Sequence, residues 1–143
     1  MDIEKLSGLE FMRKILEGRI SPGGMAEIVT MKVVELRSGY VKFHTRADNR
    51  HTNPFGGVHG GFAATVLDSV TACAVHSMLE AGIGFATLDL NIKMLKPIPL
   101  EKELVGEGKV IHLSKKIGMS EGTLMDAQDN LYAHATAIYM IKR

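Results

Sequence analysis

The stretch from Gly60 to Glu80 most constrains the fold, because it has the pattern of a long helix that must be buried. It carries one charged side chain, Asp68, before Glu80, and Gly82 follows as a helix stop signal. A helix of this length is on the order of 30 Å long, enough to cross a small domain. Because it is apolar on nearly every face, it needs cover on most of its sides. The rest of the chain must therefore wrap around residues 60–80.

The flanking segments predict that this cover is an antiparallel sheet. Ser7 and Glu10 form a capping box for a short N-terminal helix within residues 1–20. Apolar and polar residues mix in strand fashion over residues 26–36 and 40–47. With "RSG" as the turn between them, these two segments predict a hairpin. Three or four more strands are expected over residues 84–95, 103–113, 116–127 and 130–141. In the first of these, one apolar face is expected to comprise Ala86, Leu88, Leu90, Ile92 and Met94.

This order of elements predicts an α+β fold for a single domain over residues 1–143. One curved antiparallel sheet is expected to wrap around one long central helix at residues 60–80. Such a sheet leaves an edge strand and an open face, so the chain is expected to form a homo-oligomer.

Composition narrows the function classes. A net charge of +1 gives no electrostatic footprint for nucleic acid or for a membrane surface. No apolar run approaches the roughly 18–20 residues that span a bilayer, and "MDIEKLSGLE" lacks the basic start of a signal peptide. The single cysteine, Cys73, excludes an intrachain disulfide and fits a reducing compartment. We expect a cytoplasmic protein with neither a nucleic-acid nor a membrane partner.

The loop "HTNPFGGVHGG" leads directly into the predicted helix. The first N–H groups of a helix lack intrahelical partners and carry the positive end of its dipole, so the amides of Gly60 and Gly61 suit polarisation of a carbonyl oxygen. Alternatively, these glycines only allow the helix to pack closely under the sheet. Asn53 suits a tight turn. His59 either orders the loop or acts as a base, and we favour the ordering role.

Asp68 is the sharper indication of a site. Its same-face neighbours on a helix are all small: Ala64, Thr65, Thr71 and Ala72. An unpaired carboxylate in a buried helix is unfavourable, so a narrow, partly polar crevice beside Asp68 is expected. The functional interpretation is a general base or nucleophile. The structural alternative is a cap on a neighbouring loop or an ion pair.

Two other groupings on the helix are weaker. Cys73 and His76 have the spacing of a thiolate–imidazole pair, but a buried thiol in an apolar helix is usually inert. His59, Asp68 and His76 lack the short spacings of metal ligands. We therefore expect no metal and no cofactor.

The segment "HTNPFGGVHGGFAATVLDSVTACAV" resembles the signature of the hotdog-fold acyl-CoA thioesterases, specifically the PaaI-like phenylacetate-degradation clade. That clade shows N-x-x-G-x-x-H-G-G with an aspartate seven residues after the last glycine. The matching positions are Asn53, Gly56, His59, Gly60, Gly61 and Asp68. The downstream "TLDLNIKMLKP" is similar to the next strand of the family. The resemblance implies a hotdog fold along nearly the whole chain.

The resemblance also implies hydrolysis of an acyl- or aryl-CoA to free acid and CoA, with no metal. The Gly60 amide would polarise the thioester carbonyl, and Asp68 would act as nucleophile or general base. Asn53 would position water or the carbonyl, His59 would orient the loop, and Thr87 would assist the water. The aspartate would come from the partner chain in a dimer or dimer of dimers, and the clade favours a tetramer.

Substrate contacts are expected in the loop before the predicted helix, at the start of that helix and at nearby lysines. Gly61 and Phe55 are expected to contact substrate, and lysines are expected near the phosphates of CoA: Lys93, Lys96, Lys115 and Lys116. For any single one of these lysines, an ordinary solvated side chain is the alternative. Candidate residues for an acyl pocket are Phe55, Met78, Phe85 and Met94.

Two other functions remain open. One is a non-catalytic acyl-CoA-binding or sensing hotdog protein; transcription-regulating relatives carry a DNA-binding segment, for which about 25 residues before the first strand are too few. The other is a hotdog hydratase or dehydratase, which has a different Asp/His spacing on this helix. The acyl group remains open, as does the choice between CoA and acyl carrier protein.

Overall fold

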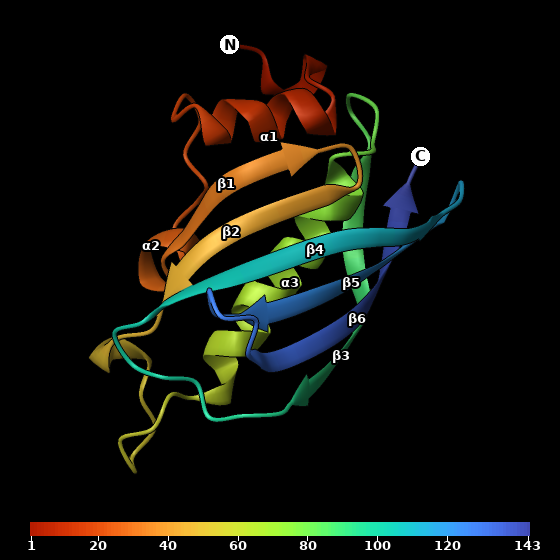
Figure 1. Ribbon diagram of the computed structural model, residues 1–143. Coiled ribbons are helices and arrows are strands. Elements are labelled where there is room, and N and C mark those ends of the chain that lie inside the picture. Colours follow the sequence, from red (N-terminus) through yellow and green to blue (C-terminus); the bar gives the residue numbers. More distant parts are fainter.

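A six-stranded antiparallel sheet curves around one long helix in the computed structural model, which describes residues 1–143 (Figure 1). The strand order is β1-β2-β4-β5-β6-β3. The predicted α+β fold is therefore confirmed. Apart from two short 3₁₀ turns at Ile3–Lys5 and Asn49–His51, the elements are α1 Gly8–Leu16, α2 Met25–Ile28, β1 Met31–Arg37, β2 Tyr40–Arg46, α3 Gly60–His76, β3 Gly84–Met94, β4 Glu103–Leu113, β5 Ile117–Met125 and β6 Leu131–Lys142.

The central helix α3 is shorter than predicted, because it ends at His76 and not near residue 80. The hydroxyl of Ser77 donates to the Ala74 carbonyl at 2.7 Å and accepts from the Gly39 amide at 2.8 Å. This side chain joins the end of α3 to the β1–β2 turn. Gly82, at φ +77°, lies in the turn that follows. None of the helices is long and apolar enough to span a bilayer.

One side of α3 packs against inward-facing glycines of the sheet. A Cβ atom at Gly108 would lie 2.0 Å from the carbonyl oxygen of Val70, and one at Gly106 would lie 2.9 Å from the Val66 side chain. The helix backbone can therefore approach β4 only because these side chains are missing. Val66 and Val70 are fully buried in this contact.

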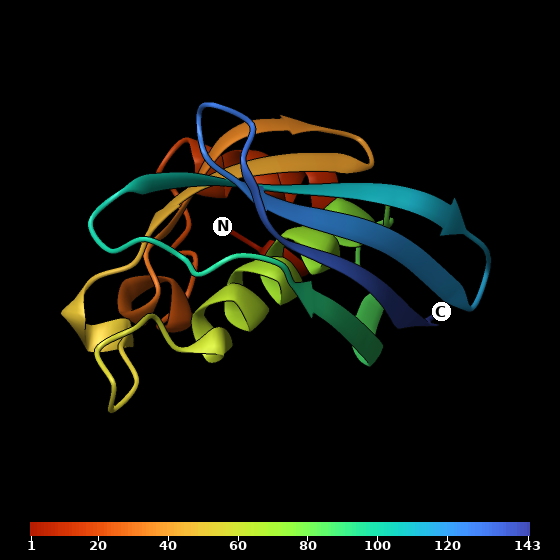
Figure 2. The same cartoon turned by 60° about the horizontal axis from the view of Figure 1, so that its bottom comes forward.

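The opposite side of α3 is only partly covered, whereas cover on most of its sides was expected. Figure 2 shows the helix lying under the curved sheet with one flank open. Small and polar residues lie half-exposed along this flank: Ala64, Thr65, Asp68, Ser69 and Ala72. The single chain thus presents Asp68 on an uncovered helix face.

Two predicted strands differ in detail. The predicted first strand begins too early, because Ala26 lies in α2, which closes with a hydrogen bond from the Val29 amide to the Met25 carbonyl. In β3 a bulge lies between Thr87, opposite Tyr139, and Asp89, opposite Ile138. The bulge shifts the alternation, so the predicted face that joins Ala86 and Leu88 to Leu90 is wrong. Phe85, Thr87, Leu90 and Ile92 are the residues that contact the helix, its Asp68 or the core.

The N-terminal helix α1 begins with the predicted capping box between Ser7 and Glu10. The Gly8 amide donates to the Leu79 carbonyl at 2.9 Å, which fixes α1 beside the turn that follows α3. Met12, at 2% exposed, enters the main core from this helix. α1 therefore forms one wall of the space beside α3.

The close contact at Gly108 predicts a large effect of a single methyl group. Gly108→Ala should destabilise the fold by about 3 kcal/mol or more, because the methyl group meets backbone atoms that cannot move without shifting α3. Gly24→Ala is the control, because no atom lies within 4 Å of a Cβ there. Urea unfolding measures both; equal stability of the two variants would contradict this account of the contact.

Candidate functional site

The loop before α3 is a tight turn built around Asn53. Its side-chain oxygen accepts from the Phe55 amide at 2.9 Å and from the Gly57 amide at 3.3 Å. Its backbone amide donates to the Gly57 carbonyl at 2.8 Å. The Asn53 carboxamide oxygen is thus used within the turn. Phe55 lies at the tip and is 98% exposed.

His59 caps the start of α3. Its Nδ1 atom accepts from the Gly61 amide at 2.7 Å, so the loop is ordered by this side chain and the Gly61 amide is occupied. The Gly60 amide has no acceptor in the protein. Gly60 lies in an open pocket of about 280 Å³, beside Met94 and Lys96. Of the two adjacent amides, that of Gly60 is therefore the one available to a ligand at the positive end of the helix dipole.

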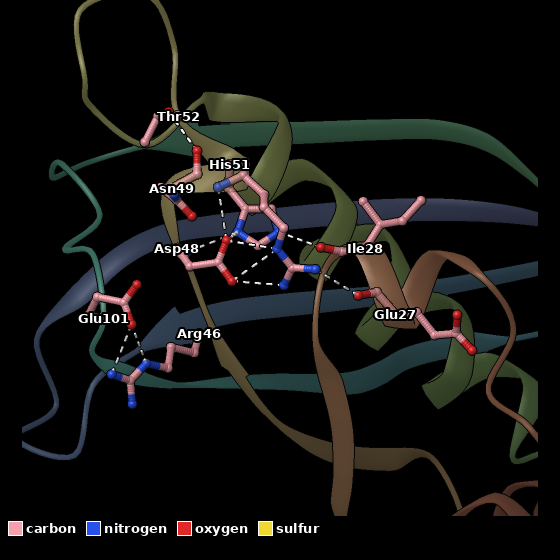
Figure 3. A network of polar contacts seen from close by, with 9 residues as sticks. Glu27, Ile28, Arg46, Asp48, Asn49, His51, Thr52 and Glu101 are labelled. Carbon is pink, nitrogen blue, oxygen red and sulfur yellow. Dashed lines mark hydrogen bonds and ion pairs between the residues drawn. The ribbon is translucent and has the colours of Figure 1, made fainter.

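A buried histidine anchors both ends of this loop (Figure 3). His51 is 6% exposed; its Nδ1 atom accepts from the Asp48 amide at 3.0 Å, and its Nε2–H donates to the Ile28 carbonyl of α2. The carbonyl of His51 accepts from the His59 amide at 2.8 Å. These bonds connect α2, the loop and the first residue before α3.

Arg50 completes the anchor. Its hydrogen bonds to the Asp48 carboxylate, with Nη2 at 2.8 Å from Oδ2, hold the pKa of Asp48 well below its usual range. Arg50 also donates to the Glu27 carbonyl of α2 at 3.4 Å (Figure 3). Sequence patterns did not reveal this network, because its members join a helix and a loop that are more than 20 residues apart.

Asp68 lies two turns along α3 from its start, in an open depression of about 440 Å³. Its Oδ1 atom accepts from the Thr87 hydroxyl at 3.3 Å and from the Tyr139 hydroxyl at 3.2 Å. Its Oδ2 atom has no protein donor, and the carboxylate forms no ion pair. The structure therefore brings Asp68 and Thr87 together and leaves one carboxylate oxygen free. The structural alternatives of a loop cap or an ion pair are not observed.

Tyr139 is the site residue that sequence analysis missed. It lies on β6 directly opposite Thr87 of β3 and is fully buried. Its hydroxyl is also 2.7 Å from the Thr71 hydroxyl and 3.1 Å from the Asp68 backbone carbonyl, so its proton is shared between that carbonyl and Oδ1. Burial, with the nearby charge of Asp68, raises the pKa of Tyr139 well above its usual range, so the phenol stays protonated and can donate. Only the strand register places Tyr139 beside Asp68, and no local spacing in the sequence indicates it.

The other predicted residues do not converge within one chain. Gly60 and Asp68 are separated by eight residues, about 12 Å along the helix axis. Lys93 and Lys96 lie toward the Gly60 end, whereas Lys115 and Lys116 lie in the β4–β5 turn at the other end of the sheet (Figure 1).

The four residues expected at the acyl pocket do not meet within a single chain. Phe55 points into solvent and Met78 lies beside Gly39. Phe85 packs against the Tyr139 ring, with 5.9 Å between ring centroids, and Met94 lies beside Gly60. These four side chains are spread along the molecule because the helix ends before Met78 and the Phe55 loop turns outward.

Cys73 and His76 do not form a catalytic pair. Burial raises the pKa of the Cys73 thiol to about 12, with a smaller contribution from the charge of Asp68. The His76 ring packs against Phe11 and Phe85, and burial lowers its pKa. No group of three or more histidine, cysteine, aspartate or glutamate side chains has the arrangement of a metal site.

The raised pKa of Cys73 predicts an unreactive thiol in the folded protein. At pH 8 a pKa of about 12 lowers the thiolate fraction roughly 1,000-fold relative to an ordinary cysteine, and the fraction grows as the pH rises. Iodoacetamide labelling followed by mass spectrometry should therefore be slow in the native protein. The protein unfolded in urea is the control and should react at the ordinary rate. Equal rates in the two states would contradict the prediction.

Comparisons with known proteins agree with this architecture. A family model for the thioesterase superfamily matches residues 55–133. A Halobacterium salinarum protein described as an esterase is 25% identical over 130 residues, covering 87% of this chain and 84% of that protein. Mouse acyl-coenzyme A thioesterase 13 is 28% identical over 75 residues, or 52% of this chain and 53% of the mouse protein.

The crystal structure of a phenylacetic acid degradation-related protein from Ralstonia eutropha superposes with a TM-score of 0.81. It is 28% identical, and the match covers 90% of this chain and 97% of that one. The resemblance drawn from the loop and Asp68 is confirmed. Since the family match spans more than half of its residues, this chain belongs to the thioesterase superfamily of hotdog-fold thioester hydrolases.

Proposed function

We propose that the protein hydrolyses the thioester bond of an acyl-CoA to give a free acid and CoA. The observation that carries this proposal is the Asp68 carboxylate, held by two hydroxyl groups at an open helix face with one oxygen free. A thioester is neutral and reactive, so one carboxylate and a donor that polarises the carbonyl suffice for its hydrolysis. The similarity to acyl-coenzyme A thioesterase 13 supports CoA as the carrier.

Asp68 acts as the general base or as the nucleophile. Tyr139 and Thr87 hold Oδ1, which fixes the plane of the carboxylate and leaves the lone pairs of Oδ2 for the reacting group. As a base, Oδ2 takes a proton from water as the water attacks the carbonyl carbon; the C–S bond then breaks, and the CoA thiolate leaves with that proton. As a nucleophile, Oδ2 attacks that carbon itself and displaces the CoA thiolate to form a mixed anhydride. Water then cleaves the anhydride, which releases the free acid, regenerates the Asp68 carboxylate and supplies the proton for the thiolate. In either route the Thr87 hydroxyl, which donates to Oδ1, assists this water as a hydrogen-bond acceptor.

Gly60 polarises the thioester carbonyl. Its amide has no other acceptor and lies at the helix N-terminus, where hydrogen bonding and the helix dipole both stabilise negative charge on oxygen. His59 keeps this end of the helix in place through the Gly61 amide. Asn53 holds the turn that leads to this end of the helix, and we infer that its amide group positions water or the carbonyl.

The site combines two subunits. About 12 Å of helix separates Gly60 from Asp68, too far for one carbonyl group to contact both in the same chain. β3 is an edge strand that pairs only with β6, and α3 has an open flank beside it. A homodimer, or a dimer of dimers, that covers this edge would bring Asp68 of one chain to Gly60 of the other. The exposed Phe55 loop would then contact the partner and the substrate.

Cations at the entrance bind the phosphates of CoA. Lys93 and Lys96 supply charge beside Gly60, and Lys115 and Lys116 supply it from the opposite end of a neighbouring chain. We further infer that residues 1–143 work as a single catalytic domain in the cytoplasm, where the lone Cys73 stays reduced.

Loss of the carboxylate tests the reaction directly. Asp68→Asn should lower kcat/KM for acyl-CoA substrates by about 100- to 10,000-fold, because the amide can neither accept a proton nor attack the carbonyl. Release of free CoA, followed with a thiol reagent, measures this over acetyl, butyryl, hexanoyl, phenylacetyl and hydroxybenzoyl thioesters. Asp129→Asn, at an exposed position in the turn between β5 and β6, is the matched control and should keep wild-type activity. Saturable binding without turnover in the wild type would instead indicate a binding protein.

Removal of one N–H group tests the role of Gly60. Gly60→Pro should lower kcat by about 100- to 1,000-fold, because proline is tolerated at the first helical position but has no amide hydrogen. Gly60→Ala keeps the amide and should remain active, since its Cβ meets only the flexible end of Met94, at 3.4 Å.

If sites are shared between subunits, mixing and refolding equal amounts of Gly60→Pro and Asp68→Asn chains should restore about one quarter of wild-type activity. About half of the dimers formed are mixed, and one of the two sites in each mixed dimer is intact. No recovery in mixtures shown to contain mixed dimers would contradict the shared site.

A further inference from the structure

We propose that the acyl group of the substrate lies in an apolar pocket between α1, α2, β1 and α3, and that this pocket selects a short, uncharged aliphatic acyl group over an aromatic ring. The inference rests on the proposed hydrolysis of acyl-CoA and names its substrate class. It also replaces the acyl pocket that the sequence predicted, whose four residues do not meet.

The pocket has a volume of about 90 Å³ and an almost wholly apolar lining. Met12 and Ile15 form its α1 wall, and Met31 contributes from β1. Ser69 and Cys73 line it from α3. No charged side chain is among its lining residues, so a carboxylate or ammonium group on the acyl chain would be buried without a partner. The lining therefore favours an uncharged acyl group.

The pocket adjoins the surroundings of Asp68. Ser69, the residue after Asp68, lines both this pocket and the open depression that contains the carboxylate. The short helix α2 also borders both, through Ala26 in the pocket and Met25 in the depression. A thioester whose carbonyl lies at Asp68 can therefore direct its acyl chain past Ser69 into the pocket.

The walls of the pocket are fixed in place. Met12 is 2% exposed and belongs to the main core. On the other side, the hydrogen bonds from His51 to Ile28 and from Arg50 to Glu27 hold α2 against the loop (Figure 3). Because both walls are anchored, the pocket is preformed, and its size limits what it accepts.

Size then decides between aliphatic and aromatic acyl groups. A cavity of about 150 Å³ is known to hold benzene in a protein core, and this pocket is smaller. A short aliphatic chain is narrower than a ring, so a pocket of this size favours the chain over the ring of a phenylacetyl group. We therefore expect the wild-type protein to prefer butyryl-CoA to phenylacetyl-CoA.

Widening the pocket should change this preference. Ile15→Ala removes three carbon atoms from the α1 wall and should raise the ratio of kcat/KM for phenylacetyl-CoA to that for butyryl-CoA by at least about tenfold. Leu16→Ala is the matched control: Leu16 is the next residue of α1, is 42% exposed and does not line the pocket. Its ratio should equal that of the wild type. Thermal unfolding of each variant checks that it remains folded.

Binding of thioether analogues tests the pocket without relying on catalysis. Calorimetry should show that the wild type binds S-butyl-CoA more tightly than S-(2-phenylethyl)-CoA. Ala26→Leu, which fills the pocket from the half-exposed position of Ala26 on α2, should weaken binding of S-butyl-CoA by about tenfold and leave S-methyl-CoA unaffected.

The outcomes separate the two proposals. The pocket proposal is overturned, and the hydrolase proposal stands, if the wild type turns over phenylacetyl-CoA in preference to butyryl-CoA. The same conclusion follows if the Ile15→Ala and Leu16→Ala variants have equal ratios of kcat/KM for the two substrates. Absence of turnover with the thioether preference intact supports the pocket and overturns the hydrolase. Equal binding of both thioethers by the wild type overturns the pocket whatever the activity.

Discussion

The close approach of α3 to the glycines of β4 and β5 is the contact on which the rest of the structure depends. At Gly108 the sheet and the Val70 carbonyl lie so close that a Cβ atom would overlap it, and Gly118 and Gly122 similarly meet Val75 and Thr71. This contact fixes both the depth and the rotation of the helix. It therefore determines which helical side chains face the sheet and which face outward.

The position of Asp68 follows from this rotation. With Val66 and Val70 directed into the sheet, Asp68 emerges at the border between the covered side and the open flank, where Tyr139 and Thr87 reach its Oδ1 atom. The phenol of Tyr139 is buried and stays protonated. It can therefore donate a hydrogen bond to the Asp68 carboxylate, and it does not compete with that carboxylate for a proton. One oxygen is fixed and the other is free, which is the arrangement that a base or nucleophile requires.

The loop before α3 has a separate anchor. His51 bonds to the Ile28 carbonyl through its ring and to the His59 amide through its own carbonyl, so α2, the loop and the helix start form one connected unit. This unit holds the free Gly60 amide at the start of α3. It also holds α2 beside Asp68. Two independent sets of contacts thus position the two reacting groups. The packing of α3 on the sheet glycines positions the Asp68 carboxylate, and the hydrogen bonds of His51 position the Gly60 amide.

The sequence by itself determined the elements whose signals are local. The apolar run after "HGG" predicted the central helix, the Ser7–Glu10 spacing predicted the cap of α1, and the alternating segments predicted the antiparallel strands. The motif from Asn53 to Asp68 also indicated the family, because its spacing lies within one loop and one helix. Such patterns can be recognised in the sequence because they depend on residues that are close together in the chain.

Only the tertiary structure decided the features that join distant segments. The end of α3 is joined to the β1–β2 turn by the Ser77–Gly39 bond, and the inward face of β3 depends on a bulge at Leu88 that alternation cannot reveal. The pairing of Thr87 with Tyr139, which completes the surroundings of Asp68, depends on strand register. The pocket beside Ser69 arises where α1, α2 and α3 meet. Each of these contacts links residues far apart in the chain, and its energy depends on packing that no local pattern encodes.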